Sequence, residues 1–249
     1  MSLAVAVYVP EGIVMASDSR LSLTIEGRKP TGEEFKVETV SSDEVNKTYL
    51  IKQPDIGISH FGQDYLADIP MSRHIRNFIE EEIISSDDVG TIPEKLVKYF
   101  KKSFPDADVG FHIAGYKKEG KTSIPHIYYC QVGRAVVQRR NITPDGSLDY
   151  GATWSGEIDV ITSIVNPVTM KDKNGKEKIV RPPVAPILWD KMTVQDAIDF
   201  AIYAIRTTID TMRFQARPKS VGGPIDVLLL TPDSEPRWIQ QKGFHGERA

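Results

Sequence analysis

The residues best placed to do chemistry lie at the two ends of the first twenty residues. Ser2 follows Met1 directly, and Ser17-Asp18-Ser19-Arg20 follows an apolar run that begins at Gly12. Removal of Met1 would give Ser2 a free α-amine, whose unperturbed pKa is about 7.7–8.0. A hydroxyl with a base on the same residue forms an N-terminal nucleophile, in which the amine accepts the hydroxyl proton. We therefore look for chemistry at Ser2.

Two short apolar runs would hold these residues in place. Leu3 to Val9 and Gly12 to Ala16 flank a Pro10-Glu11-Gly12 turn, a pattern typical of paired, buried strands. Chain ends are usually loose unless something ties them down, so a buried strand that begins at Ser2 is unusual. The pattern predicts that the Ser2 hydroxyl is fixed against a hydrophobic core.

Composition limits the kinds of protein that this chain can be. It has 249 residues, 40% of them hydrophobic and 26% charged, which suits one large domain or two small ones. A net charge of -3 offers no basic surface for nucleic acid. Cys130 is the only cysteine, which excludes an internal disulfide or a cysteine metal cluster. No apolar run approaches the roughly 18 residues that span a membrane, so we expect a soluble, cytoplasmic protein.

Hydrophobic periodicity divides the chain into blocks of strands and blocks of helices. After the opening runs, alternation predicts a long, partly exposed hairpin over 21–40 and short strands over 48–51 and 56–61. Spacings of three and four residues then predict a helix that begins near Gly62, is kinked or restarted at Pro70, and is followed by a second helix.

The second half of the chain repeats this order. Thr193 with Asp196 is a capping signal at the start of a long amphipathic helix. Segregated blocks favour an α+β domain with stacked sheets and outer helices. The remaining predictions are strands over 109–115, 127–130 and 135–137, a helix over about 157–165, a surface segment over 167–186, and strands over 225–230 and 237–241.

Four stretches occur in order along the chain: Gly12–Arg20; Asn46–Ile51 with the strand and helix after it; Thr153–Gly156; and Met192–Thr193 with the helix leading to Gly222–Val227. Together they resemble proteasome β-subunits, which belong to the N-terminal-nucleophile (Ntn) hydrolase superfamily. The segment from Thr211 to Gly222 is also similar to the bacterial proteasome homologues such as Anbu. The resemblance implies a single α+β domain over 1–249, a four-layer αββα sandwich, and assembly into homo-oligomeric rings. Surface insertions would lie at about 26–44 and 167–186.

The resemblance also implies roles for individual residues. By position, Ser2 would be the nucleophile, and the ammonium of Lys47 would lower the pKa of the Ser2 amine and keep it ready to accept a proton. Asp18 would hold Lys47, and Ser155 would hydrogen-bond the amine. Each residue also has a plainer interpretation: Asp18 could end a strand, Lys47 could be an ordinary exposed lysine, and Ser155 could cap the next helix.

Other positions complete or depart from the family pattern. The backbone N–H of His60 would face the developing oxyanion, at a position where the family usually has glycine. Arg20 and Ser220 would support the site. Pro218 stands where the family usually has aspartate, and Val221 where it usually has serine. The remaining histidines are scattered without ligand spacing, so we assign no metal site.

The leading hypothesis is a threonine-type family peptidase with a serine nucleophile. It would cleave peptides or unfolded proteins inside a ring, without a cofactor, with an activator or unfoldase as a possible partner. Two alternatives stay open. One is a catalytically silent ring or assembly subunit, and the other is an amidase of the same superfamily that acts on a small molecule.

Overall fold

The first sheet contains the two opening runs at its centre. The computed structural model describes residues 2–166, 169–171, 173, 175–179, 185–243 and 246. All neighbouring strands are antiparallel, and β1 and β2 are buried along their whole length. A strand covered on both faces needs apolar residues at every position, which explains the unbroken runs. The order is β12 (Gly151–Gly156), β1 (Leu3–Val9), β2 (Gly12–Ser17), β15 (Asp226–Leu230) and β16 (Arg237–Gln240).

The second sheet lies against the first. A buried cluster joins Ala6, Ile13 and Met15 of the first sheet to Ala114 and Ile127 of the second. The strands of this sheet are also antiparallel. Their order is β11 (Val136–Arg139), β10 (Thr122–Gln131), β9 (Val109–Glu119), β6 (Ile56–Gly62) and β5 (Thr48–Ile51).

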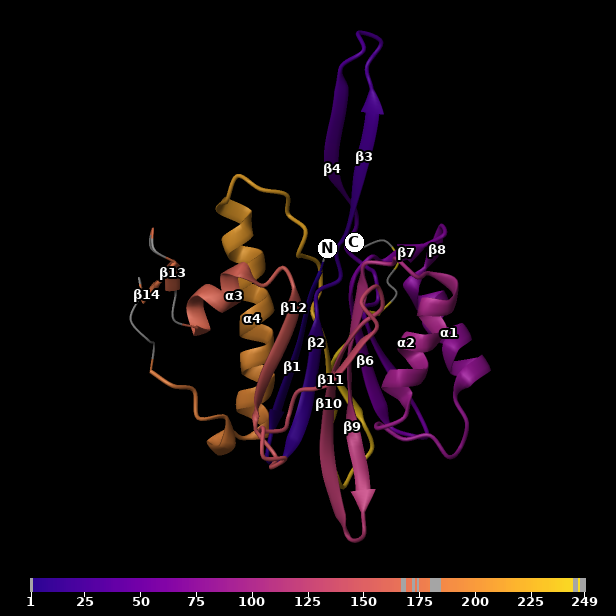
Figure 1. The fold of residues 1–249 in the computed structure, drawn as a ribbon, viewed down its shortest axis with the longest axis vertical. Helices are drawn as coiled ribbons and strands as arrows, with labels where there is room; N and C mark the ends of the chain where they lie inside the picture. The colour runs from indigo at the N-terminus through magenta and orange to yellow at the C-terminus, as the bar shows by residue number, and fades with distance from the viewer. Residues whose placement is uncertain are drawn as a thin grey trace.

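Helices cover the outer faces of the two sheets (Figure 1). Helices α3 (Asp159–Val165) and α4 (Val194–Phe214) pack on the first sheet through one buried cluster. Helices α1 (Met71–Glu82) and α2 (Ile92–Ser103) pack on the second sheet through another. Mixed helices and sheets in segregated blocks are as predicted.

Helix starts show where local sequence signals hold and where they fail. The predicted cap of α4 is present, because the Thr193 hydroxyl accepts from the Asp196 N–H and the Asp196 carboxylate accepts from the Thr193 N–H. The helix predicted from Gly62 is wrong at its start. A two-strand turn of β7 (Tyr65–Leu66) and β8 (Ile69–Pro70) comes first, and α1 begins after Pro70 because proline lacks the N–H of a helix interior.

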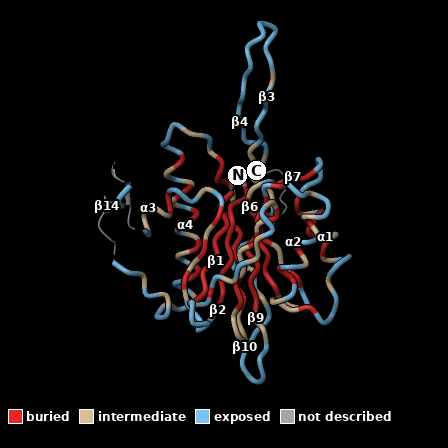
Figure 2. The backbone as a smooth tube through the Cα atoms, in the orientation of Figure 1, coloured by how far each residue is buried: buried red, intermediate tan, exposed pale blue. Residues whose placement is uncertain are grey.

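Two hairpins extend from this body. The predicted hairpin is present as β3 (Leu21–Arg28) and β4 (Glu34–Ser42), and it projects far beyond the sheets, as Figure 1 shows. It is largely exposed (Figure 2). A small hairpin of β13 (Thr169–Lys171) and β14 (Glu177–Ile179) lies within the second predicted insertion, whose positions 167–168, 172, 174 and 180–184 are outside the described residues. A 3-10 turn, η1 (Trp189–Lys191), precedes α4.

In the described part of the chain, every helix is too short or too polar to cross a lipid bilayer.

Candidate active site at the Ser2 end of the sheets

Asp18 is the centre of the hydrogen bonding at this end of the molecule. It directly follows β2 and is fully buried. Its Oδ1 accepts from the Leu3 N–H at 3.0 Å and from Lys47 Nζ at 3.1 Å. Its Oδ2 accepts from the Arg20 N–H at 3.2 Å and from the Gly222 N–H at 3.0 Å. These four donors compensate the burial of a carboxylate, and they link the start of β1 to Lys47.

Lys47 is fully buried, which excludes the interpretation that it is an ordinary surface lysine. Besides the ion pair with Asp18, its ammonium donates to the Arg20 carbonyl at 2.5 Å. Its own carbonyl accepts from the His60 N–H at 2.9 Å, which fixes the lysine backbone beside β6. A buried ammonium must be paired, and Asp18 supplies the charge.

Ser2 directly precedes Leu3, whose N–H binds the Asp18 carboxylate of this ion pair. Its side chain is buried, and its Oγ has no hydrogen-bond partner among the described residues. The Ser2 carbonyl accepts from the Glu157 N–H at 2.9 Å, while the next residue, Leu3, donates to Asp18. The predicted burial of Ser2 is therefore correct, and its hydroxyl is an unpaired polar group on the residue before Leu3, whose N–H binds the Asp18 carboxylate.

Ser155, predicted to hydrogen-bond the Ser2 amine, contacts a histidine of the second sheet. It pairs with Ala4 across β12 and β1, and its Oγ lies 2.9 Å from His112 Nε2 on the second sheet. The helix-cap interpretation fails, because α3 starts after Ile158 without a side-chain cap. Burial, with a smaller contribution from the charge of Arg140, lowers the pKa of His112 to about 3. This serine–histidine pair therefore lacks the base strength to activate a nucleophile at neutral pH.

The backbone N–H of His60, predicted to face an oxyanion, donates to the Lys47 carbonyl in this structure. The oxyanion role stays a prediction. Its imidazole Nε2 lies 2.9 Å from Asp64 Oδ1 and its ring stacks on Tyr49. Burial raises the pKa of the Asp64 carboxyl, but the His60 hydrogen bond and the charge of Lys47 outweigh it, so the net direction is downward.

Arg20 and Ser220 hold the loop that precedes β15. Arg20 forms a bidentate ion pair with Asp43, at 2.6 and 2.8 Å, and donates to the Lys219 carbonyl at 3.0 Å. Ser220 Oγ donates to Glu157 Oε1 at 3.2 Å. Pro218, where the family usually has aspartate, is exposed.

Three groups at this site are not predicted from the sequence. A chain of buried hydroxyls runs from Ser17 through Thr48 to Ser59, with oxygen–oxygen distances of 2.8 and 2.9 Å, and it joins the two sheets. Glu157 and His112 are the others. The row of hydroxyls could have been found from the sequence, because Ser17 is adjacent to Asp18 and Thr48 is adjacent to Lys47. No sequence signal placed Glu157 or His112, because their partners are distant along the chain.

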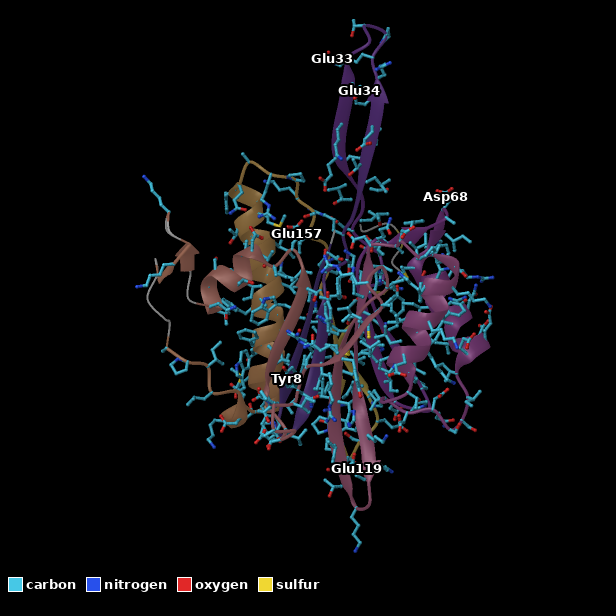
Figure 3. All side chains as sticks on the ribbon, in the orientation of Figure 1. Tyr8, Glu33, Glu34, Asp68, Glu119 and Glu157 are labelled. Carbon is cyan, nitrogen blue, oxygen red and sulfur yellow. The ribbon has the colours of Figure 1, made fainter. Side chains whose placement is uncertain are left out.

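Figure 3 places Glu157 at the end of the sheets from which the long hairpin projects, and Glu119 at the opposite end. A hollow of about 860 Å³ lies at that opposite end, lined by the β9–β10 turn and residues 230–236. It contains none of the predicted site residues. Within the described ranges, no group of three or more histidine, cysteine or acidic side chains is arranged to hold a metal ion.

The fold is similar to that of two solved structures, both of Anbu from Hyphomicrobium sp. strain MC1. The Gly-1 mutant has a TM-score of 0.59 at 16% identity, over 96% of this chain and 87% of that one. The other Anbu structure has the same score and identity, over 97% and 88%. No family model matches this chain, and neither does any curated protein. The resemblance to Anbu noted in the sequence is confirmed at the level of fold.

Proposed function

We propose that this chain is a proteasome-like peptidase of the Ntn-hydrolase superfamily, with Ser2 as nucleophile after removal of Met1. The contact that carries the proposal is Asp18 Oδ1, which binds both the Leu3 N–H and the buried Lys47 ammonium. A cation is thereby held one residue away from the hydroxyl and amine of Ser2. The sheet pair with helices on both outer faces agrees with the four-layer αββα sandwich that this class implies.

In the proposed reaction the Ser2 amine moves the protons. It takes the Oγ proton as Oγ bonds to the carbonyl carbon of the peptide, and the resulting ammonium protonates the leaving amine as the C–N bond breaks. Water then attacks the ester carbonyl and gives a proton to the amine. The amine passes this proton to Oγ as the C–O bond breaks, which releases the acid and restores the serine hydroxyl. Lys47 would favour the neutral amine by charge repulsion, and no cofactor enters these steps.

We further propose that the chain assembles into a homo-oligomeric ring in the cytoplasm, with peptides or unfolded proteins as substrates and an activator or unfoldase as a partner. The exposed apolar side chains of the β3–β4 hairpin support assembly, since such patches usually meet another protein.

A second candidate is a catalytically silent ring subunit. It is favoured by the fully buried Ser2, whose Oγ has no base within hydrogen-bond distance among the described residues. The intact mass of protein purified from its native host separates the two candidates. Loss of Met1 is expected for the peptidase, and a retained Met1 would make the proposed amine an amide and rule out the Ser2 mechanism.

Substitutions at Ser2 test the chemistry directly. With fluorogenic peptides we expect Ser2→Ala to lose activity by about 1000-fold, and Ser2→Thr, which keeps the hydroxyl, to retain it. Lys47→Ala should be similarly inactive. The matched controls are Ser86→Ala and Lys98→Ala at exposed positions, which should behave as wild type. Equal rates for Ser2→Ala and wild type would rule out peptidase activity at this residue.

A further inference from the structure

Glu157 is fixed beside Ser2 by its backbone. It directly follows β12, and its N–H donates to the Ser2 carbonyl at 2.9 Å. Gly156 permits this approach, because its φ is 102° and a Cβ there would lie only 1.7 Å from the Ser2 oxygen. The position of Glu157 relative to Ser2 is therefore set by main-chain geometry.

The side chain of Glu157 connects to the loop before β15. This side chain is only 14% exposed, and its carboxylate accepts from Ser220 Oγ at 3.2 Å. The other carboxylate oxygen forms an ion pair with Arg217, which also binds Asp159 on α3. Of the two carboxylates bound to Arg217, only that of Glu157 belongs to a residue that contacts Ser2.

The sheet order shows what this contact crosses. Glu157 follows β12 and Ser220 precedes β15, while β1 and β2 lie between those strands. At this end β1 begins and β2 ends, so the Glu157–Ser220 contact passes over the ends of both strands, where Ser2 and Asp18 lie. Two residues further along the same loop, the Gly222 N–H binds Asp18.

We propose that Glu157 is a positioning residue of the Ser2 site. Its carboxylate holds the 217–222 loop over Ser2 through Ser220 and Arg217, and it places negative charge beside the α-amine that Ser2 would have once Met1 is removed. The inference rests on the proposed function for that free amine. Proteasome β-subunits usually have an aspartate where this chain has the exposed Pro218, and the inference gives the role of that acidic group to Glu157.

A carboxylate near an amine stabilises the ammonium form and raises the pKa of the amine, whereas Lys47 acts in the opposite direction. Arg217 offsets part of the charge of Glu157, so a modest effect is expected. Other charged or titratable groups also lie at this end and bear on the pKa of the amine. They are Asp18 after β2, Arg20 with its partner Asp43, Lys47 before β5, His60 on β6, Asp64 before β7, Asp159 on α3, Lys219 in the loop, and Asp226 of β15 with Lys242.

The test compares Glu157→Gln with Asp159→Asn, in the full chain prepared with Ser2 as its first residue. Each variant removes one carboxylate from Arg217, but only the first changes a residue in contact with Ser2. The Ser2 amine is titrated by ¹⁵N NMR, and the pH dependence of peptide hydrolysis is recorded alongside. We expect Glu157→Gln to lower the amine midpoint by about half a pH unit, a threefold change in proton affinity, and Asp159→Asn to change it by less than about 0.2.

An unchanged midpoint in Glu157→Gln would overturn the inference, as would equal shifts in both variants. If Glu157→Gln does not fold, Ser220→Ala removes one of the two links to the loop. Hydrogen exchange at the Gly222 amide should then be about tenfold faster than in Asp159→Asn, and equal exchange would count against the proposal. A shifted midpoint in a protein that hydrolyses no peptide would retain the positioning role and refute the peptidase. Peptide hydrolysis without a shifted amine midpoint would retain the peptidase and refute the positioning role of Glu157.

Discussion

At the scale of single residues, the polar groups of the site are held by one another across the two stacked sheets. Asp18 and Lys47 form one link between the sheets, and their neighbours Ser17 and Thr48 form a second, through hydroxyls 2.8 Å apart. Because Lys47 has a long flexible side chain, fixing its backbone and its ammonium together reduces the freedom that an isolated ion pair would leave. Residues proposed to take part in the chemistry therefore also link the two sheets.

His112 provides a residue-scale prediction about pH. Its folded-state pKa of about 3 lies below the ordinary value of 6.5, so the unfolded chain binds a proton first as pH falls. Its contribution to stability is complete above pH 6.5 and is lost as pH falls from 6.5 towards 3. The loss amounts to roughly 2–3 kcal/mol between pH 6.5 and about pH 4.5. His112→Gln, which keeps a hydrogen-bonding group but does not titrate, should flatten this part of the curve.

Urea unfolding at several pH values measures this slope. Ser155→Ala is the control, since it removes the hydrogen bond to His112 but leaves the histidine to titrate, so its slope should match that of wild type. Equal slopes for His112→Gln and wild type over this range would show that another group controls the acid sensitivity.

At the scale of elements, the sequence predicted most strands and helices because their signals are local. The cap of α4 and the apolar runs of β1 and β2 are examples. It missed the β7–β8 turn because Leu66 and Ile69 mimic a helical spacing before Pro70. Partners across the sheets were beyond local signals. Ser155 and His112 are 43 residues apart, and only the stacking of β12 on β9 brings them together.

The β3–β4 hairpin has two unlike faces. Leu23, Ile25, Phe35 and Val37 point to one face, since Ile25 pairs with Val37 and Gly27 with Phe35. Ile25 and Val37 are each 50% exposed. The opposite face carries an ion pair between Glu26 and Lys36. An apolar ribbon outside the core adds little to folding, which makes it the natural contact region for the proposed ring.

The element-scale prediction separates assembly from folding. Ile25→Ser with Val37→Thr makes the apolar face polar, and we expect the mass from light scattering to fall while unfolding free energy changes by less than about 1 kcal/mol. Thr24→Ser with Glu38→Gln changes the neighbouring cross-strand pair on the opposite face and should leave the mass unchanged. A monomeric wild type, or an unchanged mass in the first double variant, would show that the hairpin does not form an assembly interface.

At the scale of the whole molecule, the site depends on how closely the two sheets approach. Gly57 on β6 marks a close contact, because a Cβ there would lie 2.3 Å from Met15 Sδ of β2 and 3.1 Å from Leu228 Cδ2 of β15. Any side chain at this position would push the sheets apart or displace Met15. Since Asp18 follows β2 and Lys47 precedes β5, the same spacing sets the distance between the two ions.

The whole-molecule prediction is therefore a coupling between Gly57 and Met15. Gly57→Ala alone overpacks the interface and should cost about 1–3 kcal/mol, and Met15→Ala alone should cost about 2–5 kcal/mol by leaving a cavity. In the double variant the added methyl occupies part of that cavity, so the total cost should be smaller than the sum of the two single costs by more than about 1 kcal/mol.

Gly115→Ala is the matched control, because its added methyl would face Asp55, Ile56 and Val89 and not Met15. Its cost should add to that of Met15→Ala. Additive costs for Gly57→Ala and Met15→Ala in chemical denaturation would mean that the sheets adjust their spacing freely, and the Asp18–Lys47 distance would then not be set by sheet packing.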